Sequence, residues 1–423
     1  MPTGVNQSDR MTPKTRVAEL AVAGGEPMFR QTIHVGRPNI GDRQRLRERI
    51  DDLLDRRWLT NNGQYVQEFE RRVALRIGVR HVVAVCNGTV ALEIAVRALG
   101  LTGEVIVPSF TFAATVHALH WLGITPVFCD VHPRTHTLDP RRVEELITPR
   151  TTGLIAVHLW GRACDVDDLS AIANRHHLKL LFDAAHAFGC SYQGRMVGNF
   201  GNAEVLSFHA TKVLNTFEGG AVVTNDDGLA DRLRLMRNMG FRTLDEVVSV
   251  GTNGKMSEVS AAMGLTGLES IDEFIAVNRR HYEHYRHELA GIPGITLAPV
   301  SETERSNFQY VVLDVDEAHS GISRDDLIRV LHAENIKARR YFFPGCHRMP
   351  PYRDLYPEAG ASLPETERLA ECVLCLPTGE TLTAEDVAAI CGIVRLAVSH
   401  SGDLRPILSR ETRRPKRPDD EPR

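Results

Sequence analysis

An aspartate and a lysine lie where α/β enzymes place their chemistry. Asp183 lies in the apolar run 178–185, and Lys212 follows the run 203–208, 29 positions after the aspartate. A carboxylate that ends a buried strand costs folding free energy unless it meets a cation or hydrogen-bond donors. A lysine in a closed site can have a lowered pKa and form a Schiff base with an aldehyde. Each has an ordinary alternative, because the aspartate could hold the next loop and a lone lysine is most often a solvated surface charge.

A glycine before a helix offers the third part of a site. Gly88 and Thr89 follow the apolar run 81–86 and open the helical pattern 89–100. Glycine permits a tight turn, Thr89 can cap the helix, and free N–H groups at a helix start bind phosphate. An ordinary capped helix would give the same pattern. Taken together, a phosphate cup, an acid and an amine in this order are what a pyridoxal phosphate site requires.

Seven short apolar runs must position these residues. They alternate with amphipathic stretches, which is typical of βαβ units and a mostly parallel sheet. The runs are nearly continuous in apolar residues, as expected where helices cover both faces. Active sites in such sheets lie beyond the carboxyl ends of the strands. The runs are 81–86, 104–108, 125–131, 152–160, 178–185, 203–208 and 220–226.

The 423 residues divide into four regions by pattern. We expect a flexible N-terminus over 1–25 and a large cofactor-binding domain over 26–280, with a mostly parallel seven-stranded sheet flanked by helices. From about 281 to 405 the pattern indicates a smaller α+β domain. Residues 406–423 are rich in charge and proline and are expected to be a disordered tail. The fold class is therefore α/β.

Composition excludes several classes of partner. The net charge of −4 gives no global field for nucleic acid or an anionic membrane surface. No stretch approaches the roughly 18 apolar residues of a membrane helix, and the N-terminus lacks a secretory core, so we expect a cytoplasmic protein. The eight cysteines are scattered, as reduced thiols are. We expect no metal site, because His281, His284 and His287 drift around a helix and read as an exposed face.

Seven motifs resemble those of the DegT/StrS nucleotide-sugar aminotransferases. The resemblance covers about residues 30–400 and implies the aspartate-aminotransferase-like fold, which is fold type I of the pyridoxal phosphate enzymes. The motifs occur in the family's order. They are WLTNNG (58–63), CNGTVAL (86–92), PSFTFAAT (108–115), DAAHAFG (183–189), SFHATKVLNTFEGGAVVTND (207–226), GTNGKMSEVSAAMG (251–264) and YFFPGCHRMPPY (341–352).

The resemblance implies roles around the cofactor ring. Lys212 holds pyridoxal 5′-phosphate as a Schiff base and, once freed, moves the proton between the donor and the cofactor. Asp183 pairs with the pyridine nitrogen. His186 lies against the ring near its O3′ side, and Phe112 stacks over the ring face.

The resemblance also implies contacts at the two ends of the cofactor pocket. Gly88, Thr89 and Ser207 hold the phosphate. Asn253 reaches the phosphate of the neighbouring subunit, so the active unit is a homodimer with shared active sites. His347 is similar to a histidine at the sugar end. The chain departs from the family at Gln309, where many members carry histidine, and at 253–255, where Tyr or Asn-Tyr-Arg is usual.

The implied reaction moves an amino group from L-glutamate to a nucleotide keto sugar, with the cofactor passing through its pyridoxamine phosphate form. The segment HATKVLN (209–215) is similar to members that act at C4 of a dTDP-4-keto-6-deoxyhexose and give a dTDP-4-amino-4,6-dideoxyhexose, such as the 4-aminotransferase of desosamine biosynthesis. C3-aminating members often resemble Tyr-Pro-x-Lys-Asn-Leu-Gly there.

Several alternatives stay open. Amination at C3, or of another nucleotide keto sugar, would use the same residues. A C3-dehydrating member would carry histidine in place of Lys212. A cofactor-binding regulatory protein without turnover belongs to another class, and such proteins usually carry a fused DNA-binding domain.

Overall fold

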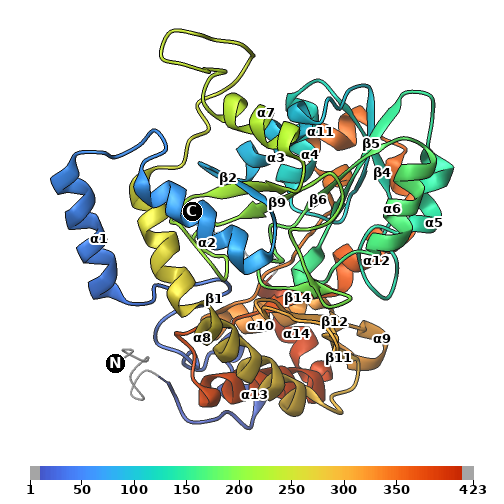
Figure 1. Cartoon of the computed structure of the whole chain (residues 1–423). Coiled ribbons are helices and arrows are strands. Elements are labelled where there is room, and N and C mark those ends of the chain that lie inside the picture. Colours follow the sequence, from blue (N-terminus) through green and yellow to red (C-terminus); the bar gives the residue numbers. More distant parts are fainter. Residues whose placement is uncertain (1–9, 412–423) are drawn as a thin grey trace.

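The computed structural model describes residues 10–411 of the chain (Figure 1). All seven runs form strands of one sheet in the order β2–β10–β9–β6–β5–β3–β4. Strand β10 is antiparallel to both of its neighbours, and the other neighbouring strands pair in parallel. The prediction of a mostly parallel seven-stranded sheet is therefore confirmed. The strands are β2 His81–Val85, β3 Glu104–Pro108, β4 Thr125–Cys129, β5 Thr151–Val157, β6 Lys179–Asp183, β9 Ala203–Ser207 and β10 Gly220–Thr224.

Helices cover both faces of this sheet. Successive residues of a strand point to opposite faces, so each strand contributes side chains to two cores. In β2, Val83 and Val85 pack into the core formed with α3, α4 and α7. Val82 and Ala84 pack instead into the core formed with α2 and α8. Burial on both faces explains why the strands are almost wholly apolar. The helices are α2 Gln64–Ile77, α3 Gly88–Ala98, α4 Ala113–Trp121, α6 Val166–Arg175, α7 Asp227–Arg237 and α8 Glu258–Leu289.

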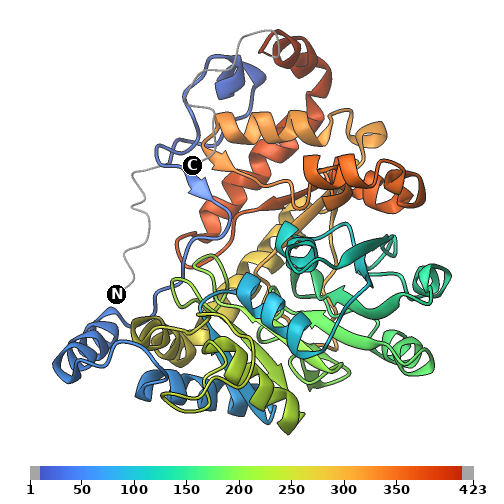
Figure 2. The same ribbon diagram turned by 90° about the horizontal axis from the view of Figure 1, so that it is seen from above.

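A smaller α+β unit has its own core around an antiparallel sheet of order β11–β12–β14. Figure 2 shows its orange and red helices set apart from the green and cyan sheet region. Its main elements are β11 Ile295–Leu297, β12 Val311–Val315, α10 Arg324–Ala333, β13 Ile336–Lys337, α12 Pro364–Cys372, β14 Val373–Leu376 and α13 Ala384–Ser399. Shorter elements are α5 Pro140–Val143, β7 Ser191–Tyr192, β8 Arg195–Met196, α9 Glu317–Ser320 and α11 Pro350–Leu355.

The N-terminal residues belong to this smaller unit, which corrects the expectation of a flexible segment for residues 10–25. The Lys14 amine meets the Glu334 carboxylate at 2.7 Å, and both side chains are buried. Glu334 also accepts hydrogen bonds from the backbone N–H groups of Ala21 and Met28. Strand β1, Ile33–His34, then pairs in parallel with β13. No local pattern of residues indicates this contact, because its partners lie about 300 positions apart. Residues 1–9 lie outside the described residues.

Two expected boundaries also differ from the structure. Residue 280 lies inside α8, whose first half packs in the large-domain core and whose last turns pack in the small-domain core. Helix α14, Ser401–Glu411, buries Leu408, so the expected disordered tail is wrong for residues 406–411. The tail from 412 onward lies outside the described residues.

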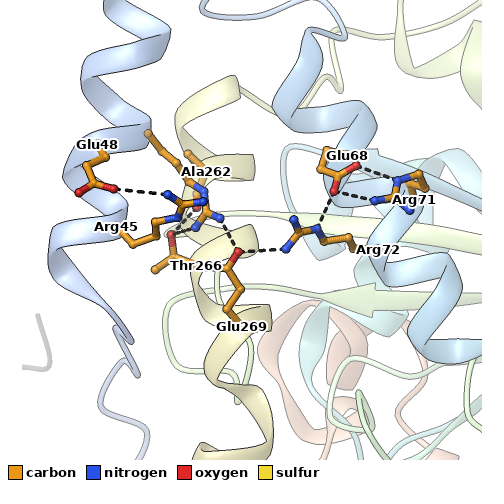
Figure 3. Close-up of polar contacts among 9 residues, drawn as sticks. Arg45, Glu48, Glu68, Arg71, Arg72, Ala262, Thr266 and Glu269 are labelled. Atoms are coloured by element: carbon orange, nitrogen blue, oxygen red, sulfur yellow. Dashed lines mark hydrogen bonds and ion pairs between the residues drawn. The ribbon is translucent and has the colours of Figure 1, made fainter.

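Charged side chains attach α1, Arg43–Arg56, to the two helices beside it (Figure 3). The buried Arg49 donates to Thr266 of α8 at 2.7 Å and also pairs with Glu269. Arg72 of α2 reaches the same Glu269 at 3.0 Å. Glu269 therefore links three helices through charged side chains.

Two further structural facts bear on the expected absences. Within residues 10–411, no single helix is long and apolar enough to span a membrane, although α13 and α14, bent by 89°, meet the length and composition limits together. In the same range, no three His, Cys, Asp or Glu residues gather as metal ligands would. His281 is buried and bonds to Thr378, so the expected exposed histidine face is wrong at this residue.

Candidate active site

The sheet brings three of the predicted site segments to one edge. Strands β2, β9 and β6 run in the same direction, so their carboxyl ends face the same side. Asp183 is the last residue of β6, and Ser207 is the last residue of β9. Gly88 begins α3 directly after β2. Lys212 follows β9 by five positions and lies in a tight turn, in which its own backbone N–H donates to the carbonyl of His209 at 2.9 Å.

Asp183 is a buried carboxylate held only by neutral donors. Thr115 donates its hydroxyl to Oδ2 at 2.8 Å, and the N–H of Ala185 donates to Oδ1 at 3.0 Å. Burial raises the pKa of this carboxyl group above its usual value. No Lys, Arg or His of residues 10–409 forms an ion pair with it. Such a carboxylate favours a cation beside it, and a protonated pyridine nitrogen supplies one.

The amine of Lys212 is buried without a carboxylate partner among the described side chains. Its Nζ donates to the hydroxyl of Tyr310 at 3.3 Å. Burial lowers the pKa of Lys212 to about 8, and the charge of Asp183 acts in the opposite direction. At pH 7 about a tenth of the amine is therefore neutral, far more than for a lysine with an ordinary pKa, and the neutral amine is the form that attacks an aldehyde.

The start of α3 forms a cup for an anion. Asn87 caps this helix by accepting the N–H of Val90 at 2.8 Å, so the cap is Asn87 and not Thr89 as expected. The N–H groups of Gly88 and Thr89 are in the first turn and have no intrahelical acceptor. A Cβ at Gly88 would lie 3.1 Å from the Cβ of Ser207, a contact so tight that Ser207 would have to shift, so glycine suits the close approach of the helix start to β9.

His186 and Phe112 lie in an aromatic group around Phe342. The ring of His186 stacks on Phe342 with centroids 5.7 Å apart and 4° between planes, and its other neighbour, Tyr310, is 4.7 Å away. The backbone N–H of Trp160 donates to Nδ1 of His186 at 3.3 Å. Burial lowers the pKa of His186 well below its usual value, so the ring is neutral. Phe112, at the start of α4, is 58% exposed and its ring is 6.4 Å from Phe342, so its face is open to a ligand.

His347 is placed differently from the expectation at the sugar end. The residue is buried, and both of its ring nitrogens are in use. Nδ1 lies 2.7 Å from the hydroxyl of Ser109, and Nε2 lies 2.7 Å from Glu367. The ring therefore ties the segment around residue 347 to the end of β3, and we do not retain a direct sugar contact for it.

Asn253 is exposed on a segment that lies beside the end of β2. The carbonyl of Gly254 accepts the N–H of Cys86 at 2.8 Å, which fixes this segment next to the helix start of the phosphate cup. The contact of Asn253 with a neighbouring subunit stays a prediction.

Sequence reasoning missed four residues of the site. Thr115 lies within the PSFTFAAT motif, and Trp160 ends the predicted strand 152–160, so both had a signal. Gln309 was noted only as a departure from the family pattern. Tyr310 had no signal, because it reaches Lys212 from the smaller domain across 98 positions.

The residues present fit pyridoxal phosphate. A buried anion, a buried amine with a lowered pKa and an open helix start lie at one edge of the sheet, and these match the ring nitrogen, the aldehyde and the phosphate. Asp183, Lys212 and the cup of Gly88, Thr89 and Ser207 would hold them respectively.

Comparison with known proteins agrees with this chemistry. The profile of the DegT/DnrJ/EryC1/StrS aminotransferase family matches residues 41–395. The dTDP-4-amino-4,6-dideoxy-D-glucose transaminase of Escherichia coli is 36% identical over 363 residues, which cover 85% of this chain and 97% of that protein. The GDP-perosamine synthase of Caulobacter vibrioides is 37% identical, with 84% and 95% covered. The solved structure of DesI in the presence of its TDP-sugar product is 50% identical, with a TM-score of 0.88 and 94% and 100% covered. The chain therefore belongs to the DegT/DnrJ/EryC1/StrS family of pyridoxal phosphate-dependent aminotransferases.

Proposed function

We propose that this aminotransferase moves an amino group from L-glutamate to C4 of a dTDP-4-keto-6-deoxyhexose and gives a dTDP-4-amino-4,6-dideoxyhexose. The transaminases of E. coli and Shigella dysenteriae, at 36% and 38% identity, are named for a 4-amino-4,6-dideoxy sugar on dTDP. The 50% identity with DesI, solved with a TDP-sugar product, supports the same nucleotide. We place the enzyme in deoxyaminosugar biosynthesis for an antibiotic. The 38% identity with the erythromycin biosynthesis sensory transduction protein EryC1 of Saccharopolyspora erythraea supports this placement.

The side chains of the site divide the work of such a transfer. When bound, the protonated cofactor ring withdraws electrons from the donor's α-carbon. Asp183 keeps that ring nitrogen protonated, because a buried anion strongly favours a neighbouring cation. The neutral amine of Lys212 first makes the covalent attachment and then carries a proton at Nζ. The cup at Gly88 and Thr89 anchors the phosphate during both half-reactions.

The observation that carries the proposal is that the amine of Lys212 and the buried carboxylate of Asp183 lie at one edge of the sheet, neither in an ion pair with the described residues, in a chain whose relatives are named for a 4-amino sugar. The test is an assay of the purified protein with L-glutamate and a panel of keto sugars, with the product identified by NMR. A dTDP-4-amino-4,6-dideoxyhexose is the expected product. An amino group at C3, or no product from the dTDP sugar, would contradict the proposal.

A GDP-linked 4-keto sugar is the second candidate substrate. The Caulobacter protein at 37% identity, and others from Vibrio cholerae and E. coli O157:H7 at 33% and 32%, are GDP-perosamine synthases. The same assay separates the two, because kcat/KM for the dTDP sugar should exceed that for the GDP sugar by at least about tenfold, which corresponds to one or two lost contacts.

We also propose a homodimer with shared active sites. The loop from Met239 to Val250 leaves Phe241, Leu244 and Val250 exposed, and Leu244 and Val250 are about nine-tenths accessible. Figure 1 shows this loop in yellow-green, projecting beyond α7. Exposed apolar side chains in such number favour burial against another protein surface. The adjoining Asn253 would then lie close to the phosphate cup of the second subunit.

A further inference from the structure

A segment of four residues, Asn307–Tyr310, connects the smaller domain to both sides of the site. It lies directly before β12. The buried side chain of Asn307 donates to the carbonyls of His186 and Phe188, at 2.8 and 3.1 Å. Its Oδ1 accepts the N–H of Gln309 at 3.1 Å, which fixes the direction of the next side chain. The segment is therefore anchored on the loop that follows Asp183.

The side chain of Gln309 spans the backbone on either side of Lys212. Its Oε1 accepts the N–H of Val213 at 2.9 Å, and its Nε2 donates to the carbonyl of Thr211. A carboxamide in this position bonds like a neighbouring strand and restricts the backbone dihedrals at Lys212. Both polar atoms of the Gln309 side chain therefore bond to this backbone and not to a substrate.

Tyr310 completes the contact at the far end of the lysine side chain. Its hydroxyl accepts a hydrogen bond from Nζ at 3.3 Å. The ring is fixed by His186 at 4.7 Å and by Tyr341 at 6.4 Å. Burial raises the pKa of this phenol well above its usual value, so the hydroxyl keeps its proton. A neutral phenol can accept from the protonated amine and donate to the neutral one, so it can orient Lys212 in both states.

We propose that Gln309 and Tyr310 are positioning residues, through which the smaller domain sets the backbone and the amine of Lys212. Nothing in the family resemblance assigns either residue this part. The inference rests on the proposed function of Lys212. It adds that the reactivity of Lys212 depends on contacts that the large domain alone does not supply.

The first experiment measures the amine itself in cofactor-free protein. Pyridoxal, which lacks the phosphate, is added across a pH series, trapped with borohydride, and the adduct at residue 212 is quantified by peptide mapping. Tyr310→Phe removes the acceptor of a charge-assisted hydrogen bond, so the midpoint of labelling should fall by about one pH unit. The control is Tyr285→Phe, which removes another buried small-domain phenol, one that bonds to the carbonyl of Pro377 at 3.0 Å. Its midpoint should equal that of the unchanged protein.

The second experiment measures the backbone clamp. In Gln309→Leu the amide of Val213 loses its acceptor, and its hydrogen exchange should become at least about tenfold faster. Gln309→Glu keeps the acceptor for Val213 and should keep the protection, while it loses the donor to Thr211. In the enzyme loaded with cofactor, Gln309→Leu and Gln309→Glu should each lower kcat by about tenfold or more and leave KM for the sugar within about twofold. A displaced Lys212 backbone misplaces the reacting amine and not the bound sugar.

The outcomes separate this inference from the proposed function. If residue 212 of the unchanged protein takes no label, the role of Lys212 itself is wrong. If it takes label normally, and Tyr310→Phe keeps the same midpoint and Gln309→Leu the same exchange rate, the positioning role is overturned.

Discussion

The carboxylate of Asp183 partly counteracts the effect that burial has on the amine of Lys212. Burial lowers the pKa of the amine to about 8, and the negative charge of Asp183 raises it. The relation is mutual, because burial raises the pKa of Asp183 and the charge of Lys212 lowers it. Each group thus keeps the other closer to its ionised form before a cofactor arrives.

Asp183→Asn tests this relation. Without the anion, the pKa of Lys212 should fall by about one further unit, which labelling of residue 212 with pyridoxal and borohydride across pH would show. Turnover should also fall by at least about 100-fold, because asparagine cannot keep the ring nitrogen protonated. Asp165→Asn removes a charge from the start of α6 and should change neither quantity. An unchanged midpoint in Asp183→Asn would show that the two groups do not interact.

Lys212→Ala tests the covalent attachment. Turnover should fall by at least about 1,000-fold, since the variant loses both the nucleophile and the proton carrier. The phosphate cup remains, so the protein should still bind the cofactor without an adduct after borohydride. Lys179→Ala, at the exposed start of β6, should keep both the adduct at residue 212 and full turnover. Normal activity of Lys212→Ala would rule out the assigned chemistry.

The sequence was sufficient to predict the large sheet and the residues at its carboxyl edge. Each strand is a short apolar run with both faces buried, so its composition carries the signal locally. The residues that follow β2, β6 and β9 then meet because parallel strands end on the same side. Asp183 and Lys212 were found in this way, and their common site follows from topology alone.

The remaining features depend on contacts between distant segments, which local pattern does not encode. Lys14 and Glu334 are polar residues that read as surface charges until their pairing is seen. His347 was expected to contact the sugar, but whether its nitrogens are free is decided by Ser109 and Glu367, each brought by a different element. The contact of Tyr310 likewise joins distant segments, since its hydroxyl bonds to Lys212 of the large domain.

Two buried histidines predict a loss of stability in mild acid. Burial lowers the pKa of both His136 and His281 to about 4. As the pH falls below about 6.5, the unfolded chain takes up protons at these residues while the folded chain does not, so stability declines until the pH reaches about 4. Between pH 6.5 and 5 each residue should account for about 2 kcal/mol of the free energy of unfolding.

Urea unfolding of cofactor-free protein at pH 7 and pH 5 measures this decline. In His281→Asn, the difference between the two pH values should shrink by about 2 kcal/mol, since the titrating group is gone. His287→Asn lies on the same helix but is exposed, and its difference should match that of the unchanged protein. Equal differences in both variants would mean that His281 does not titrate on unfolding in this range.

The shared active site makes a prediction that two inactive variants can test together. If Asn253 serves the neighbouring subunit, Lys212→Ala and Asn253→Ala proteins that are unfolded, mixed and refolded should form hybrid dimers with one intact site, and so regain up to about a quarter of full activity by random pairing.

A charge in the exposed loop, Val250→Glu, should shift the protein toward monomer in light scattering, because it places a carboxylate in a buried apolar contact. Trp121→Glu changes an equally exposed side chain beside β4, at the opposite edge of the sheet from β2, and should leave the dimer intact. Full activity of a Val250→Glu monomer, or no recovery in the mixture, would show that each subunit carries a complete site.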